Sequence, residues 1–259
     1  MGTTARTLTD LYAATVVCIS YRLAPEFPWP YAHHDGWDSL VWIAANTASL
    51  GADPSAGFVV GGASAGGNIA AVIAQKSISN AKGEGEEEGK DRVAAPLTGL
   101  WMDVPMLFAR PENVPEEYRK YHLSAEQNAD APGLLTPHAI QFIRDSVRAD
   151  GYSPDFSPVN AGEPHVGMPK TFLQVAGMDM YRDDGLIYRR MLEETGVQTR
   201  LRVYAGVPHG HANLYPGLQA SKQAKVDTIE GIGWLLGRDV GRERVVQAME
   251  GVTGLKRNV

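Results

Sequence analysis

Residues 57–75 read GFVVGGASAGGNIAAVIAQ: an apolar run, several glycines around one serine, then small and apolar residues. A short β-branched run such as 57–62 is typical of a buried strand, and 66–75 has the composition of a helix. The stretch therefore predicts a strand that turns sharply into a helix, with Ser64 at the turn.

Gly62 to Gly66 (GASAG) match the G-x-S-x-G pattern of a nucleophilic serine on such a turn. We expect side chains two residues before and two residues after Ser64 to collide, which would explain both glycines. The following helix would direct its positive end toward the reacting oxygen. Glycine accounts for 28 of 259 residues, so the pattern alone has little specificity, but the flanking strand and helix supply the setting it requires.

A serine nucleophile needs a base, and the base needs an orienting carboxylate. Asp179 follows the apolar run 171–176, and His209 follows the run 199–204. The carboxyl ends of parallel strands meet at one edge of a sheet, where open α/β folds place their sites. We therefore expect Ser64, Asp179 and His209 to form a catalytic triad.

Other residues compete for the two partner roles. Asp183 and Asp184 suit the first turn of a following helix better than the triad. His211 is an alternative base, or a metal ligand beside His209, although no further ligand cluster is evident. We expect no metal or organic cofactor. The remaining histidines are expected at the surface, at a helix start or in structural positions: His33, His34, His122, His138 and His165.

Short strand patterns alternate with longer helical ones, which predicts an α/β fold with a mostly parallel sheet and helices on both faces. The expected strands cover 15–20, 57–62, 97–104, 171–176 and 199–204. The expected helices cover 35–45, 66–75 and 183–195, with a final helix through Val226 and Leu236. Residues 79–92 are rich in Gly and Glu and predict a solvated loop. Residues 105–150 look mostly helical, with Thr136 and Pro137 beginning one helix.

The formal charge of −6 argues against a nucleic-acid partner. A single cysteine, Cys18, excludes an intrachain disulfide and a Cys-rich metal site. No apolar stretch reaches the length of a membrane helix, and residues 11–19 fit a strand better than a signal peptide. These features predict a cytoplasmic protein with no membrane partner.

Four ordered motifs in residues 12–236 resemble hormone-sensitive-lipase-like (GDXG-type) esterases of the α/β-hydrolase fold. They are YRLAPE at 21–26, GASAGGN at 62–68, Gly177-Met178-Asp179 with Arg182-Asp183, and Tyr204 leading to His209-Gly210. The resemblance implies a carboxylesterase or lipase-like acyl hydrolase, a single α/β-hydrolase domain over 1–259, and a helical cap over 105–150. It implies that 21–26 brace the sheet. Cap residues would line an apolar substrate pocket or simply pack: Met106, Leu107, Phe108, Leu134 and Leu135.

The chain departs from this pattern near its start. The family's His-Gly-Gly-Gly segment, which supplies oxyanion-binding amides, has no counterpart before Tyr21, so the Ala65 N–H is the expected oxyanion donor. The strand before that segment would separate 15–20 from 57–62, and we expect the sheet to lack the family's N-terminal strands. The two flanking strands then pair directly, another element fills the gap, or the chain is a shortened form. An exposed sheet flank would favour a homodimer.

Three functions agree with these residues. The first is hydrolysis of a small carboxylic ester through an acyl-enzyme on Ser64. The second is ligand binding on an inactive hydrolase scaffold. The third is a biosynthetic acyl transfer or cyclisation that uses the same serine and histidine.

Overall fold

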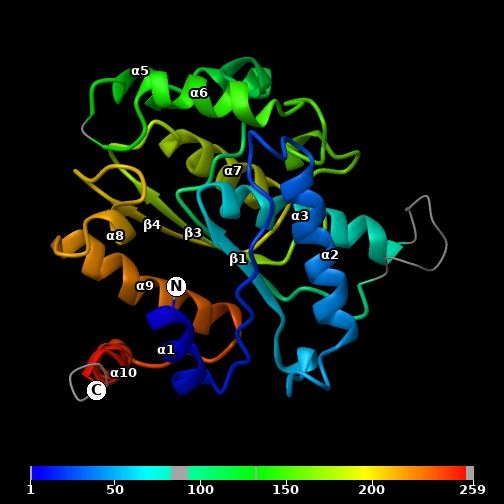
Figure 1. Cartoon of the computed structure of the whole chain (residues 1–259), viewed down its shortest axis with the longest axis vertical. Coiled ribbons are helices and arrows are strands. Elements are labelled where there is room, and N and C mark those ends of the chain that lie inside the picture. The colour runs from blue at the N-terminus through cyan, green and yellow to red at the C-terminus, as the bar shows by residue number, and fades with distance from the viewer. Residues whose placement is uncertain (1, 83–92, 132, 255–259) are drawn as a thin grey trace.

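The computed structural model describes residues 2–82, 93–131 and 133–254. Four parallel strands form one sheet in the order β1-β2-β3-β4. The strands are β1 (Val59–Ala63), β2 (Gly99–Asp103), β3 (Lys170–Ala176) and β4 (Thr199–Tyr204). Because all four run in the same direction, their carboxyl ends share one edge of the sheet, as the sequence predicts (Figure 1).

Helices cover both faces of the sheet (Figure 1). One face carries α2 (Tyr31–Ala45), α3 (Ala65–Lys82) and α7 (Arg182–Glu194), and the other carries α1 (Gly2–Tyr12), α9 (Gln219–Leu235) and α10 (Arg242–Gly254). Alternation along β2 explains the two layers: Leu100 and Met102 are buried toward α3 and α7, while Trp101 packs among residues of α1 and α9. The predicted α/β fold is thus confirmed.

Residues 105–150 hold helices and no strand within their described part. They form η2 (Pro111–Asn113), α4 (Glu116–Arg119), α5 (Ser124–Gln127) and α6 (Pro137–Val147), at the top of Figure 1. The Thr136 side chain accepts a hydrogen bond from the Ala139 amide and Pro137 is the first helical residue, so the predicted start of this helix is confirmed. The remaining elements are η1 (Pro54–Ala56), η3 (Pro158–Asn160) and α8 (His211–Leu214).

The predicted strand 15–20 is wrong. These residues pair with no described strand, and Val16, Val17 and Ile19 are 36%, 42% and 43% exposed. A strand exists only where a neighbour accepts and donates its backbone hydrogen bonds. β1 pairs with β2 alone, so direct pairing between β1 and 15–20 does not occur.

The limits of several other elements also differ from prediction. α3 continues to Lys82, so 79–82 are helical, and the rest of the predicted loop, 83–92, lies outside the described residues. α2 begins four residues early, directly after Pro30. The helices α1 and α10 were not predicted. They pack against each other and against α9, with Leu8, Tyr12 and Val245 buried between them.

Candidate active site

Ser64 sits between the end of β1 and the start of α3, in a left-handed backbone conformation with φ of 55°. Its amide donates a 2.8 Å hydrogen bond to the Asp103 carbonyl at the end of β2, which fixes the turn to the neighbouring strand. This conformation is costly for a residue with a side chain, and with it the hydroxyl reaches His209.

The two glycines of the motif differ in their packing. A Cβ atom on Gly62 would lie 2.4 Å from the backbone carbon and oxygen of Gly66, so only glycine fits there. A Cβ on Gly66 would meet nothing within 4 Å. The expected collision is therefore correct for Gly62 and wrong for Gly66, because the space around Gly66 is open.

Hydrogen bonds connect the three predicted triad residues in one chain. Ser64 Oγ lies 2.7 Å from His209 Nε2, and His209 Nδ1 lies 2.6 Å from Asp179 Oδ2. A carboxylate only accepts hydrogen bonds, so the tautomer that satisfies both contacts carries its proton on Nδ1 and leaves Nε2 free to accept from Ser64. Asp179 and His209 are both buried, at 1% and 5% exposed.

Backbone contacts hold the loops of Asp179 and His209 together. The amide of Gly177 donates to the Tyr204 carbonyl, and that of Met178 donates to the Val207 carbonyl. The second oxygen of Asp179 accepts the amide of Tyr181 at 2.9 Å, so its carboxylate cannot rotate away from His209. The ring of Tyr181 then meets the ring of His209 edge to face, with centroids 6.1 Å apart.

The 105–150 segment also contacts the Asp179 loop, through a residue that the sequence analysis missed. The amide group of Asn128 donates to the Asp179 carbonyl at 2.9 Å. Asn128 is buried, and its contact spans 51 residues of sequence. No local pattern marks such a contact.

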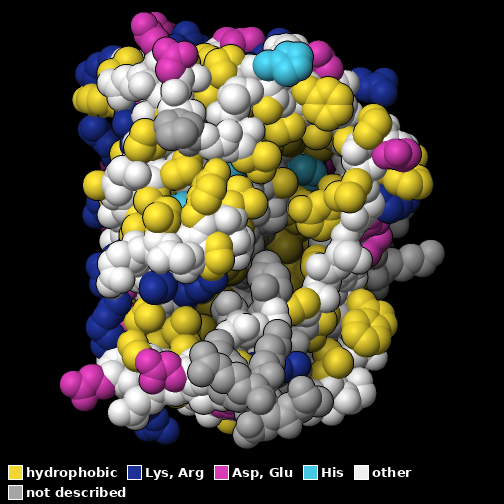
Figure 2. Space-filling model, turned by 60° about the vertical axis from the view of Figure 1, so that its left-hand side comes forward, with side chains coloured by type: hydrophobic (Ala, Val, Ile, Leu, Met, Phe, Trp, Pro, Cys, Tyr) yellow, Lys and Arg dark blue, Asp and Glu magenta, His cyan; other side chains and the backbone are white. Residues whose placement is uncertain are grey.

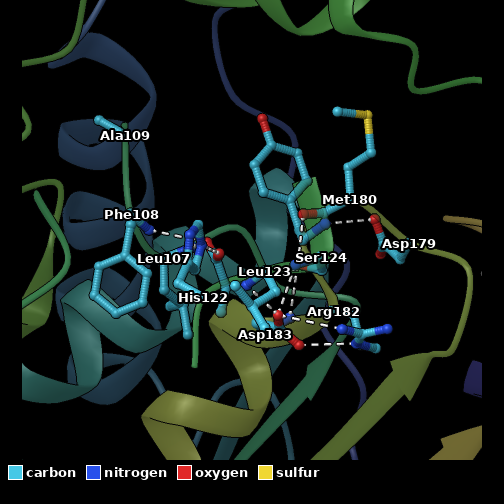
Figure 3. A network of polar contacts seen from close by, with 12 residues as sticks. Leu107, Phe108, Ala109, His122, Leu123, Ser124, Asp179, Met180, Arg182 and Asp183 are labelled. Carbon is cyan, nitrogen blue, oxygen red and sulfur yellow. Dashed lines mark hydrogen bonds and ion pairs between the residues drawn. The ribbon is translucent and has the colours of Figure 1, made fainter. Parts of the chain in front are cut away.

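Asp183 and Asp184 lie in the first turn of α7, as expected, and they also bind the 105–150 segment. Figure 3 shows the contacts of Asp183 with Leu123 and Ser124. One oxygen of Asp183 accepts the amides of Leu123 and Ser124. One oxygen of Asp184 accepts the amides of Leu107 and Phe108 at 2.8 and 3.0 Å. These two carboxylates therefore fasten the segment beside the triad.

His122 completes this attachment, which gives it the structural position that was one of the two expectations for it. Its Nε2 lies 2.8 Å from Asp184 Oδ1, and both side chains are buried. Burial alone would lower the pKa of His122, but the hydrogen bond and charge of Asp184 raise it above the usual value. Burial also raises the pKa of Asp184, so this contact is a hydrogen bond between two buried titratable side chains.

Asp103 is a further buried carboxyl near the triad. Burial, reinforced by the charge of Asp179 and opposed by His209, raises the pKa of Asp103 to about 7. Its Oδ1 has no hydrogen-bond partner among the described residues. A carboxyl in this state stays largely protonated below neutral pH.

The other histidines take different roles. His33 is buried in α2 with Nε2 2.7 Å from the Asn68 side chain, so the expected surface position is wrong. His165 is buried, and burial lowers its pKa to about 4. The Nδ1 of His211 lies 3.2 Å from the Ser221 hydroxyl. Within the described chain, no three His, Cys, Asp or Glu side chains gather as a metal site would require.

The five predicted substrate-contact residues separate into three groups. Leu107 and Phe108 are buried in the main core, although Phe108 also lines a cavity. Met106 and Leu135 pack against the cluster of Ile140, Met180 and Tyr181, the last two of which follow Asp179 in the chain. Leu134 is 62% exposed. On the face shown in Figure 2, hydrophobic side chains gather around a recess.

The comparisons with known proteins agree with this geometry. Residues 2–213 match the model of a family described as having the alpha/beta hydrolase fold. The chain belongs to this family. Within it, the resemblance to the hormone-sensitive-lipase-like esterase branch is confirmed.

Three matches illustrate the relationship. An AB hydrolase superfamily protein of Schizosaccharomyces pombe is 36% identical over 229 residues, 88% of this chain and 64% of that protein. The versiconal hemiacetal acetate esterase of Dothistroma septosporum is 30% identical over 233 residues, 89% of this chain and 66% of that enzyme. The crystal structure of vibralactone cyclase matches with a TM-score of 0.75 and 35% identity, over 84% of this chain and 60% of that one.

The chain spans slightly less than two thirds of the length of these curated relatives. None of the helices in the described ranges is long and apolar enough to cross a bilayer.

Proposed function

We propose that this protein hydrolyses small carboxylic esters through an acyl-enzyme on Ser64. The observation that carries the proposal is the continuous chain of hydrogen bonds from Asp179 through His209 to Ser64. His209 takes the hydroxyl proton while Ser64 Oγ attacks the ester carbonyl carbon, and Asp179 stabilises the imidazolium that forms. The alcohol then leaves with that proton. His209 next removes a proton from water, which attacks the acyl-enzyme and releases the acid.

The oxyanion formed in each step needs donors beside the nucleophile. Ala65 is the first residue of α3, and first-turn amides of a helix have no intrahelical acceptor. We assign the Ala65 N–H as one donor, assisted by the positive end of α3. Each such donor contributes roughly 10²- to 10³-fold to turnover in comparable sites.

We assign residues 105–150 the role of a cap over the site. Four contacts support this role: Asn128 holds the Asp179 loop, and Asp183, Asp184 and His122 join the segment to α7. A cap excludes water and shapes the pocket for the acyl and alcohol groups. Met106 and Leu135 are its candidates for substrate contact, since both pack against the cluster that contains Tyr181.

Hydrolysis of 4-nitrophenyl acetate and butyrate by the full chain and by Ser64→Ala tests the proposal. We expect the wild-type chain to release nitrophenol and the variant to lose this activity while it stays folded. Two folded and equally inactive proteins would contradict the proposal and favour a ligand-binding scaffold.

A second candidate is intramolecular acyl transfer, favoured by the similarity to vibralactone cyclase. The same acyl-enzyme would be attacked by a hydroxyl of the substrate instead of water. Product analysis of a hydroxy-acid ester separates the two reactions, because cyclisation yields a lactone and hydrolysis yields the free hydroxy acid.

A further inference from the structure

A cavity of about 280 Å³ lies between the 105–150 segment and the start of α7. Residues from three stretches line it: Phe108 and Arg110 before α4, Ile140 and Arg144 on α6, and Met180 with Tyr181 after β3. Its volume suits a group of several heavy atoms, near the lower end of the range for small-molecule pockets.

The cavity lies close to the triad. Tyr181 forms part of its wall, and the ring of Tyr181 also meets the ring of His209, with centroids 6.1 Å apart. His209 Nε2 in turn contacts Ser64 Oγ. The same aromatic side chain therefore lines the cavity and contacts the catalytic histidine of the proposed reaction.

Two guanidinium groups supply unmatched positive charge at this cavity. The guanidinium of Arg110 is exposed and forms no hydrogen bond or ion pair with any described residue, and only the backbone carbonyl of Arg110 accepts a hydrogen bond, from the Asn113 amide. Arg144 is half-buried and uses its Nε to donate to the Ala109 carbonyl at 3.0 Å, while its two terminal nitrogens have no acceptor within the described chain. Guanidinium groups bind carboxylates through paired hydrogen bonds.

The acidic group that lines the same cavity does not neutralise these arginines. Both oxygens of Asp184 are occupied, one by two backbone amides and the other by His122. Asp145, on the same helix as Arg144, is exposed and accepts from Gln141. The cavity therefore offers apolar walls together with two cations that lack a protein carboxylate.

We propose that this cavity binds a free carboxylate at the far end of the substrate, so that the preferred esters carry a carboxylate separated from the ester carbonyl by a short apolar chain. This inference rests on the proposed function. The apolar walls formed by Phe108, Ile140 and Met180 would contact the chain, and Arg110 with Arg144 would bind the carboxylate. A neutral chain of equal length would leave the guanidinium groups without this partner.

The kinetic test compares the mono-4-nitrophenyl esters of glutaric and adipic acid with the same compounds whose free acid is methylated. We expect kcat/KM to be 10- to 100-fold higher for the free acids. In the double variant that combines Arg110→Gln with Arg144→Gln, the ratio of kcat/KM for the free acid to that for the methylated ester should fall toward one. The control is Arg6→Gln with Arg244→Gln, two exposed positions on α1 and α10 that give the same change in charge, and it should keep the ratio. Equal rates for acid and methylated esters in the wild-type chain would overturn the inference.

Direct binding separates this inference from the proposed function. Calorimetric titration of the full chain with glutarate needs no turnover, and we expect binding that Arg110→Gln abolishes or weakens at least tenfold. Arg110 loses no described contact on substitution, so this variant should fold normally. Glutarate binding without any ester hydrolysis would support the carboxylate site in the cavity and contradict the proposed esterase activity. Hydrolysis of neutral esters, with no glutarate binding and no preference for free-acid esters, would support the proposed esterase activity and contradict the carboxylate site in the cavity.

Discussion

His122 and Asp184 meet at 2.8 Å between Nε2 and Oδ1, and this buried contact joins the 105–150 segment to the helix that begins beside Asp179. The two residues are 62 positions apart. The same carboxylate also accepts the amides of Leu107 and Phe108, where the segment leaves β2. A single side chain thus fixes both the exit from the sheet and the middle of the proposed cap.

Removal of the Asp184 carboxylate should lower the stability of the fold. We expect Asp184→Ala to lower the free energy of unfolding by about 3–5 kcal/mol, because it leaves His122 and two buried amides without their partner. Esterase activity should fall as well, since the Asp179 loop adjoins α7. Urea melts measure the effect, with the exposed Glu126→Ala on α5 as the control within the same segment. Equal midpoints for Asp184→Ala and Glu126→Ala would contradict the assigned role.

The two glycines of the serine motif should respond differently to alanine. Gly62→Ala places a methyl group 2.4 Å from the Gly66 backbone, so we expect a loss of at least about 1–3 kcal/mol in stability together with the loss of activity. Gly66→Ala meets open space within helix α3 and should keep or slightly increase stability. Thermal melts of the two variants test this difference. Similar destabilisation by both would show that the turn is packed differently.

The raised pKa of Asp103 predicts that the stability of the fold depends on pH. Its pKa is about 7 in the folded chain against 3.8 for the free group, so the unfolded chain ionises first as pH rises. Folding therefore loses stability between about pH 4 and pH 7, by at most about 4 kcal/mol. Asp103→Asn should remove this slope and be more stable than the wild-type chain at pH 8, with little difference at pH 4. Parallel stability curves from pH 4 to 8 would refute the assignment.

Asp179 should act by orienting His209. We expect Asp179→Asn to reduce kcat for ester hydrolysis by roughly 10⁴, because an amide at that position favours the wrong histidine tautomer. The variant should keep its fold, since the second oxygen can still accept the Tyr181 amide. Steady-state kinetics and circular dichroism measure the two effects. A variant that retains more than a tenth of the activity would place the essential carboxylate elsewhere.

Sequence patterns predicted those parts of the candidate site that depend on local structure. Ser64, Asp179 and His209 each follow a strand in a parallel sheet, so strand periodicity and chain order place all three at one edge. The predicted strand 15–20 failed because pairing depends on a neighbour, and an apolar extended run looks the same with or without one. The roles of Asn128 and His122 were missed because each contacts a partner more than fifty residues away in the sequence, where no local pattern indicates it. The open space at Gly66 likewise depends on tertiary packing.

The central claim is that Ser64 forms an acyl-enzyme, and mass spectrometry of the intact chain tests it most directly. The full chain is mixed with a fluorophosphonate or with excess 4-nitrophenyl butyrate, quenched in acid and weighed beside Ser64→Ala. We predict that one adduct forms on the wild-type chain, at the peptide that contains Ser64, and that the folded variant forms none. Absence of an adduct on the folded wild-type chain, or an equal adduct on Ser64→Ala, would contradict the claim.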